Sequence, residues 1–203
     1  MLATTSTIES TVLRSACGLS VPLDVDHWRH HADAVETSIL ADLDGPVLDV
    51  GCGPGRIVTA LAASGRVAMG VDSSPAASEE ANRRGAAVLT RSVFDPLPGE
   101  RRWRSVVFLD GNIGIGGDPV ALLVRANQLL APGGVVLAEV GAPGSATDRL
   151  TVRVESPHGR GPWFAWARLS ADDVALHFVE AGLIPGEVET AGGRWFARAT
   201  TRR

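Results

Sequence analysis

The chain has 203 residues, of which 45% are hydrophobic, and it carries a net charge of −4. This length and composition predict one globular domain that is large enough to bury a core and a small-molecule cleft. The acidic balance argues against a broad basic surface for nucleic acid. No apolar run reaches the roughly 18 residues that a membrane span requires. We therefore expect a cytoplasmic protein that has no membrane contact and no secretory segment.

Three residue counts exclude further classes of chemistry. The two cysteines, Cys17 and Cys52, are too few and too far apart for a disulfide framework or a zinc site. All 19 basic residues are arginine, because the chain contains no lysine, and it also contains no tyrosine. Schiff-base chemistry, phosphate loops that depend on lysine, and reductases that use a Tyr/Lys pair are therefore excluded.

The N-terminal part is predicted to be an arm followed by one helix. Residues 1–22 show weak periodicity, so we expect a partly ordered arm. Residues 23–43, which include Trp28, have apolar positions at helical spacing and predict an amphipathic helix that caps the domain. His27 and His31 lie four positions apart on its other side, but no further ligand has recognisable spacing, so we predict no metal site.

Residues 47–56 (VLDVGCGPGR) combine a buried strand with a glycine-rich turn. Glycine at positions 51, 53 and 55 leaves no Cβ between the backbone and a ligand, and it allows positive φ angles. The helix predicted to follow, over residues 57–64, directs its N-terminal amides toward the same place. This pattern indicates that a ligand lies against the turn.

Strands and helices then alternate up to residue 141. The predicted strands are 67–72, 86–90, 105–110 and 135–140, and the predicted helices are 74–84 and 118–130. The strand 67–72 ends at Asp72, and the strand 105–110 leads into a second glycine-rich turn. Such alternation implies βαβ units and a parallel sheet, whose strands present their carboxyl ends to a ligand at one edge.

The last third departs from this alternation. Strands at 150–155 and 163–169 predict a hairpin-like insertion over residues 142–169. Residues 170–203 predict a closing helix that ends at Gly182, followed by two strands, the last of which is antiparallel to its neighbour.

Three segments resemble motifs of class I S-adenosylmethionine-dependent methyltransferases. Residues 47–56 resemble the first motif, residues 70–72 the second, and residues 129–134 (LLAPGG) the turn before the fifth strand. The resemblance covers roughly residues 44–141, which we expect to be the cofactor-binding core, and is to a small bacterial member of this family. It implies an α/β fold, a Rossmann-like three-layer α/β/α sandwich, with a mostly parallel seven-stranded sheet, an antiparallel final strand and a small hairpin insertion.

The resemblance implies that S-adenosylmethionine is the cofactor and assigns roles to residues. Asp49 is expected near the amino-acid end of the cofactor, and Asp72 is expected to accept both ribose hydroxyls, with a helix N-cap as its alternative role. The acid that the family often places after the third strand is absent, so adenine recognition stays open. The expected cofactor-binding residues are Asp49, Gly51, Cys52, Gly53, Gly55, Asp72, Ser73, Ser92, Val93, Asp95, Asp110 and Gly111.

Methyl transfer is an in-line displacement that depends mainly on positioning and needs a base only where the acceptor must lose a proton. The candidates for a base are Asp110, His31 and His158. Asp110 could equally be a cofactor ligand, His31 a solvated helix residue and His158 a turn residue. The expected substrate residues are Trp28, Asn112, Trp163 and Trp166. The aromatic residues among them would also suit a dimer interface or an ordinary core.

Several functions stay open at this point, and the main prediction is methyl transfer to a small molecule. A nucleic-acid or protein methyltransferase is opposed by the acidic balance and by residues 110–113 (DGNI), which differ from the Asn/Asp-Pro-Pro-aromatic motif of such enzymes. A nicotinamide-dependent oxidoreductase would need a third glycine where Arg56 stands. A non-catalytic cofactor-binding protein and a homodimer also stay open. The sequence does not indicate the methyl acceptor.

Overall fold

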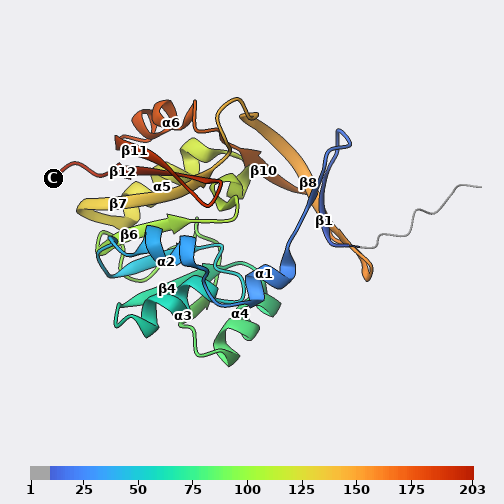
Figure 1. The fold of residues 1–203 in the computed structure, drawn as a ribbon, viewed down its shortest axis with the longest axis horizontal. Coiled ribbons are helices and arrows are strands. Elements are labelled where there is room, and N and C mark those ends of the chain that lie inside the picture. Colours follow the sequence, from blue (N-terminus) through green and yellow to red (C-terminus); the bar gives the residue numbers. More distant parts are fainter. Residues whose placement is uncertain (1–9) are drawn as a thin grey trace, which may run out of the picture.

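A computed structural model describes residues 10–203 and contains two β-sheets (Figure 1). The larger sheet has seven strands, and its spatial order reverses at β3, the strand that precedes the glycine-rich turn. In this order the strands are β11 (Ile184–Ala191), β12 (Arg194–Thr200), β7 (Leu130–Val140), β6 (Trp103–Phe108), β3 (Val47–Val50), β4 (Ala68–Asp72) and β5 (Val88–Thr90).

The pairing of these strands confirms the predicted sheet. Neighbours from β7 to β5 are parallel, whereas β12 is antiparallel to both β7 and β11. Parallel neighbours require crossover helices, which explains the alternation read from the sequence. Since consecutive parallel strands end at one edge, the turns after β3, β4 and β6 lie close together.

Helices cover both faces of the larger sheet, so the predicted three-layer sandwich is confirmed. Successive strand residues point to opposite faces. Val47 belongs to the core cluster that contains residues of α2 (Ala34–Leu40) and α3 (Arg56–Ala63), whereas Leu48 belongs to the cluster that contains residues of α5 (Pro119–Leu129) and α6 (Val174–Glu180). The remaining helices are α1 (Val25–Arg29), α4 (Pro75–Arg83) and the 3-10 helix η1 (Asn112–Gly117). No helix within residues 10–203 is long and apolar enough to cross a membrane.

The single helix predicted over residues 23–43 is wrong, because the structure has α1 and α2 there. Asp24 caps α1, and His30 follows it in an extended conformation. Asp33 then starts a new helix through a capping box with Glu36, in which each side chain accepts a hydrogen bond from the other residue's backbone N–H. Two N-terminal caps therefore divide a segment whose apolar spacing looked continuous.

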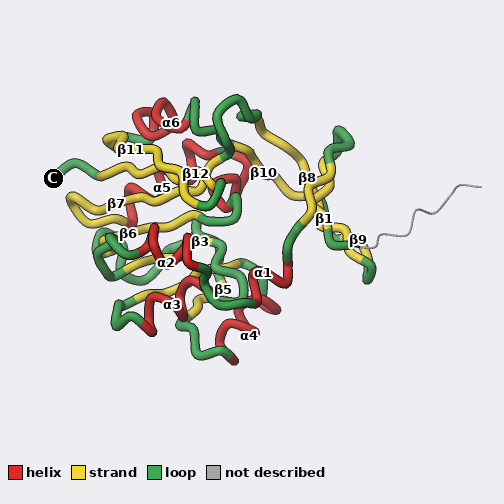
Figure 2. The backbone as a smooth tube through the Cα atoms, in the orientation of Figure 1, coloured by secondary structure: helices red, strands yellow, loops and turns green. Residues whose placement is uncertain are grey.

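The predicted hairpin insertion is present but belongs to a larger sheet, which we call the cap sheet. It comprises β1 (Val12–Ser15), β2 (Ser20–Pro22), β8 (Asp148–Ser156), β9 (Gly159–Arg160) and β10 (Phe164–Arg168). Thus residues 12–15 and 20–22, predicted as part of a partly ordered arm, are strands, while residues 1–9 of that arm lie outside the described part. Figure 2 shows β1 and β8 extending together away from the larger sheet.

Candidate active site

A cavity of about 870 Å³ opens at the carboxyl ends of β3, β4, β5 and β6. This volume lies within the range of roughly 300–1,000 Å³ that is typical of small-molecule sites. The turns after these strands line the cavity, together with residues of α1, α3, α4, η1, β8 and β10. The cap sheet therefore adds apolar side chains to the same cavity as these turns.

The three glycines of the first turn have different functions in the structure. Gly53 lines the cavity with φ at 51°, and a Cβ added there would meet no atom within 4 Å. A Cβ on Gly51 would lie 2.7 Å from the side chain of Asn112, whose Nδ2 donates to the Gly51 carbonyl at 2.9 Å. Gly55 lies outside the lining and needs its missing Cβ for packing, since one there would lie 2.7 Å from the Cβ of Ala86.

Asp72 lies at the end of β4 and joins the first turn to the start of α4. Its Oδ2 accepts from the Gly53 N–H at 2.9 Å, and its Oδ1 accepts from the Ser74 N–H at 2.8 Å. The N-cap of α4 is Ser74, which accepts from Ala77, so Asp72 does not fill that alternative role. Each carboxylate oxygen can accept a further hydrogen bond, so Asp72 fits a ligand with a vicinal diol.

Asp49 is a buried acid on the cavity wall, with only 2% of its surface exposed. Burial raises its pKa to about 8, and the nearby charges of Asp110 and Asp72 add to this effect. Each cause disfavours the ionised form of the carboxylate, and a bound cation would reverse that preference. Asp49 is therefore arranged to ionise when a positively charged group binds beside it.

For S-adenosylmethionine, the cofactor that the sequence resemblance implies, we predict binding that strengthens as the pH rises from 6 toward 8, by up to about tenfold per pH unit. Below the pKa of about 8, Asp49 is protonated in the free protein and must lose its proton before it can attract an ammonium group. Calorimetric titrations at pH 6, 7 and 8 measure this dependence. Asp49→Asn should flatten it, whereas a pH-independent affinity in the wild type would contradict the role of Asp49.

The loop after β5 supplies one part of the cavity wall. Ser92 and Val93, which were predicted to bind the cofactor, line the cavity, and so does Phe94, which was not predicted. Arg125 of α5 fixes this loop, because its Nε donates to the Val93 carbonyl at 2.9 Å and its Nη2 to the Asp95 carbonyl at 2.7 Å. Asp95 itself lies outside the lining.

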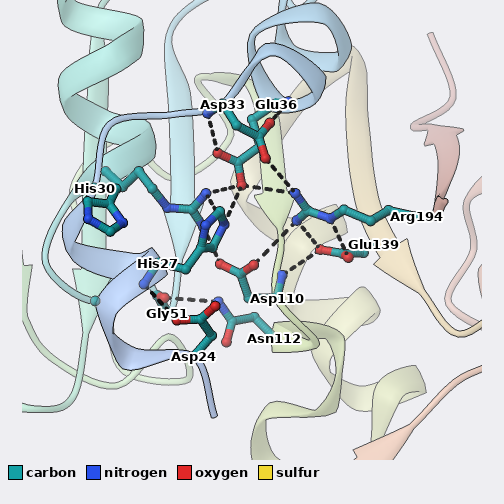
Figure 3. A network of polar contacts seen from close by, with 12 residues as sticks. Asp24, His27, His30, Asp33, Glu36, Gly51, Asp110, Asn112, Glu139 and Arg194 are labelled. Carbon is teal, nitrogen blue, oxygen red and sulfur yellow. Dashed lines mark hydrogen bonds and ion pairs between the residues drawn. The ribbon is translucent and has the colours of Figure 1, made fainter. Parts of the chain in front are cut away.

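Beside the cavity lies a charged network that the sequence did not reveal (Figure 3). Its members come from α2 and its cap, the start of α3, the turn after β6, and strands β7 and β12. We define it as Asp33, Glu36, Arg56, Asp110, Glu139 and Arg194.

Arg56 and Arg194 hold the network together. The Arg56 side chain is 3% exposed and pairs with both Glu36, which is fully buried, and Asp110. Arg194 donates to Glu139 from Nε at 2.8 Å and from Nη2 at 2.7 Å, and its Nη1 lies 3.1 Å from Glu36 Oε1. These contacts join the N-terminal segment to the sheet around one wall of the cavity.

Asp110 is the network member with a carboxylate on the cavity wall. It has a φ of 54°, which is uncommon outside glycine, and its backbone N–H donates to Glu139 Oε2 at 2.7 Å. Burial raises the pKa of Asp110, and Arg56 opposes this rise. The strained backbone and the two arginines fix the direction of the carboxylate.

The histidines do not form the pair considered from the sequence. His31 is exposed and lies beyond the end of α1, whereas His27 Nε2 lies 3.1 Å from Arg56 Nη1 and 3.6 Å from Glu36 Oε1. His27, Asp33 and Glu36 offer potential ligand atoms within 4.8 Å of one another. Asp33 and Glu36 belong to the charged network, and Arg56 of that network contacts both His27 and Glu36.

The structure separates the other predicted residues into two groups. Trp28, Asn112, Trp166, Ser73 and Cys52 line the cavity. Burial raises the pKa of the Cys52 thiol, and a Cβ on Gly70 would lie 2.4 Å from its Sγ, so this side chain packs against β4. Outside the lining are Gly111, His31, His158 and Trp163.

Trp163 is 45% exposed, with the Arg153 guanidinium 4.5 Å from its ring centroid. His158 is exposed in the turn between β8 and β9. Asp110 is therefore the one member of the predicted catalytic set that lines the cavity.

Comparisons with known proteins agree with this fold. The crystal structure of a S-adenosylmethionine-dependent methyltransferase from Bacteroides fragilis, in complex with S-adenosyl-L-homocysteine, has a TM-score of 0.79 at 20% identity, over 98% of this chain and 90% of that chain. The 1,6-didemethyltoxoflavin-N1-methyltransferase from Burkholderia thailandensis has a TM-score of 0.65 at 18% identity, over 88% and 82%. The sugar N-methyltransferase KedS8 from Streptoalloteichus has a TM-score of 0.61 at 21% identity, over 83% and 84%.

The sequence itself decides the family. No curated protein matches it. The family described as "Methyltransferase domain" matches residues 26–183, which include the glycine-rich turn, Asp72 and most of the cap sheet. The chain therefore belongs to the methyltransferase domain family and is an S-adenosylmethionine-dependent methyltransferase.

Proposed function

We propose that this enzyme transfers the methyl group to a small-molecule acceptor that binds between the cofactor and the cap sheet. The observation that carries the proposal is the composition of the cavity, whose lining combines the glycine-rich turn and Asp72 with Phe164 and Trp166 of β10. Apolar and aromatic walls with a few polar groups are typical of small-molecule sites. The related structures named for action on didemethyltoxoflavin and on a sugar support the same class of acceptor.

The residues of the cavity support a division of roles. When bound, S-adenosylmethionine supplies an electrophilic methyl group. We assign its ribose to Asp72, its ammonium group to Asp49, and its contact with the backbone to Gly53, where no Cβ intervenes. We assign Asp110, in the turn after β6, to the side of the reacting methyl group. These residues orient the reactants for in-line displacement. Such orientation contributes most of the rate acceleration in a reaction of this kind.

The acceptor class can be tested by methyl transfer from a cofactor labelled in its methyl group. Purified enzyme is incubated with separate small-molecule, protein and nucleic-acid fractions of a cell extract. We expect label in the small-molecule fraction, and less of it with Asp72→Ala when the cofactor concentration is kept near the Kd of the wild type. Label found only in protein or nucleic acid would contradict the proposal.

A further inference from the structure

Aromatic side chains from β10 and α1 line the cavity. Phe164 and Trp166 are alternate residues of β10 and therefore point to the same face. Their rings meet edge to face, with centroids 6.0 Å apart and planes at 86°. Trp28 of α1 lines the cavity as well. We call these three residues the aromatic wall. Such a wall binds apolar groups, and its ring faces also attract cations.

Asp110 is the carboxylate that remains available to an acceptor in this cavity. Asp72 already accepts hydrogen bonds from the Gly53 and Ser74 N–H groups, and Asp49 is buried in β3, where we assigned the cofactor. The Asp110 side chain is 21% exposed, lines the cavity, and keeps its direction through Arg56, Arg194 and the bond from its own N–H to Glu139.

The charged network gives this part of the cavity an excess of negative charge. Four carboxylates, those of Asp33, Glu36, Asp110 and Glu139, share the two guanidinium groups of Arg56 and Arg194. An anionic acceptor beside Asp110 would be repelled, because two like charges close together in a partly desolvated site are energetically unfavourable.

The other arginines of the cavity lining do not compensate for this excess. Arg29 pairs with Glu80 at 3.2 Å, so these two charges cancel. Arg91 donates to the Pro96 carbonyl at 2.8 Å, on the side of the loop after β5. The region around Asp110 therefore favours a positively charged or neutral group over an anion.

We propose that the methyl acceptor is a small organic amine, held with its nitrogen beside Asp110 and its apolar part against the aromatic wall. This inference rests on the function proposed above. In the reaction, the ammonium form of the acceptor first gives a proton to the Asp110 carboxylate or to water, and the lone pair of the resulting neutral amine then forms the bond to the methyl carbon. The carbon–sulfur bond breaks with its electron pair going to sulfur, which leaves neutral S-adenosylhomocysteine and a methylated ammonium ion.

The test compares probes that share one scaffold and differ in the charge of their polar group. Each of three scaffolds, phenyl, indol-3-yl and cyclohexyl, carries an ethylamine, an ethanol or an acetate group. Binding of these nine compounds is measured at pH 7 to the full chain saturated with S-adenosylhomocysteine. On at least one scaffold the amine should bind about tenfold or more tightly than the alcohol, as one charge-assisted hydrogen bond would give. The acetate should bind most weakly.

Asp110→Asn should bring the affinities for the amine and the alcohol within about threefold of each other while the alcohol keeps its affinity. Asparagine tolerates the positive φ at this position. Asp44→Asn is the matched control, because this acid has an 81% exposed side chain and lies outside the cavity. This variant should keep the preference for the amine over the alcohol.

Equal affinities for the amine, alcohol and acetate, tighter binding of an alcohol or acetate, or no binding of any amine would overturn the proposal. Failure of S-adenosylhomocysteine itself to bind appears separately, in the saturation step.

Discussion

Replacing Arg56 with methionine is expected to lower the free energy of unfolding by about 3–5 kcal/mol, the usual effect of removing one partner from a buried ion pair. The Arg56 side chain is 3% exposed, and its partner Glu36 is fully buried. Without Arg56, Glu36 keeps one guanidinium contact, the shared one with Arg194 at 3.1 Å, and Asp110 loses its closer guanidinium. Urea unfolding at pH 7 measures the difference.

Arg83→Met is the control for this substitution, because Arg83 forms an exposed pair with Glu79 one helical turn away. Exposed pairs of this kind contribute little, so the control should unfold close to the wild type. Equal stability of the two variants would show that the network does not stabilise the fold. Glu36→Leu combined with Arg56→Met should recover part of the loss, because it removes the uncompensated buried charge.

The second large effect concerns cofactor binding at the end of β4. Asp72→Ala is expected to weaken S-adenosylmethionine binding by about 1.5–3 kcal/mol, or roughly 10- to 150-fold, the scale of hydrogen bonds to a charged group. The variant loses the acceptors for the ribose and also the bonds from the Gly53 and Ser74 N–H groups, which shape the turn. Calorimetry with the wild type and the variant measures the change.

Asp95→Ala provides the matched control, since it removes the same charge from the neighbouring loop outside the cavity lining. Its affinity for S-adenosylmethionine should equal that of the wild type. Unchanged binding in Asp72→Ala would remove Asp72 from the ribose role. An equal loss in both variants would show that net charge, rather than the geometry of Asp72, governs binding.

The central sheet was predictable because its signals are local. The strand ending at Asp72 and the helix with Ser74 as N-cap and Pro75 in its first turn appear in the structure as predicted, since both depend on a few adjacent residues. β1 could not be found in this way. Its register with β8, in which Val12 faces Glu155, joins residues that are distant in sequence. The capping box of Asp33 and Glu36 was a readable local signal for the start of α2.

In the candidate site, too, the residues with local signals were predicted and the contacts between distant residues were not. Asp49, Gly53, Asp72 and Asp110 were predicted from strand ends and glycine turns, which parallel topology brings to one edge. The charged network was missed because the contact between Arg194 and Glu36 joins residues 158 positions apart. Gly55 was assigned to the cofactor because its motif does not distinguish a glycine that faces a ligand from one that packs against Ala86.

The measurement that tests the central claim most directly is a calorimetric titration of the purified full chain with S-adenosylhomocysteine and, separately, with NAD. We predict that S-adenosylhomocysteine binds with one molecule per chain, that the Asp72→Ala variant binds it more weakly, and that NAD gives no binding heat. Tight binding of NAD together with no binding of S-adenosylhomocysteine or S-adenosylmethionine would contradict the assignment of this cavity to S-adenosylmethionine.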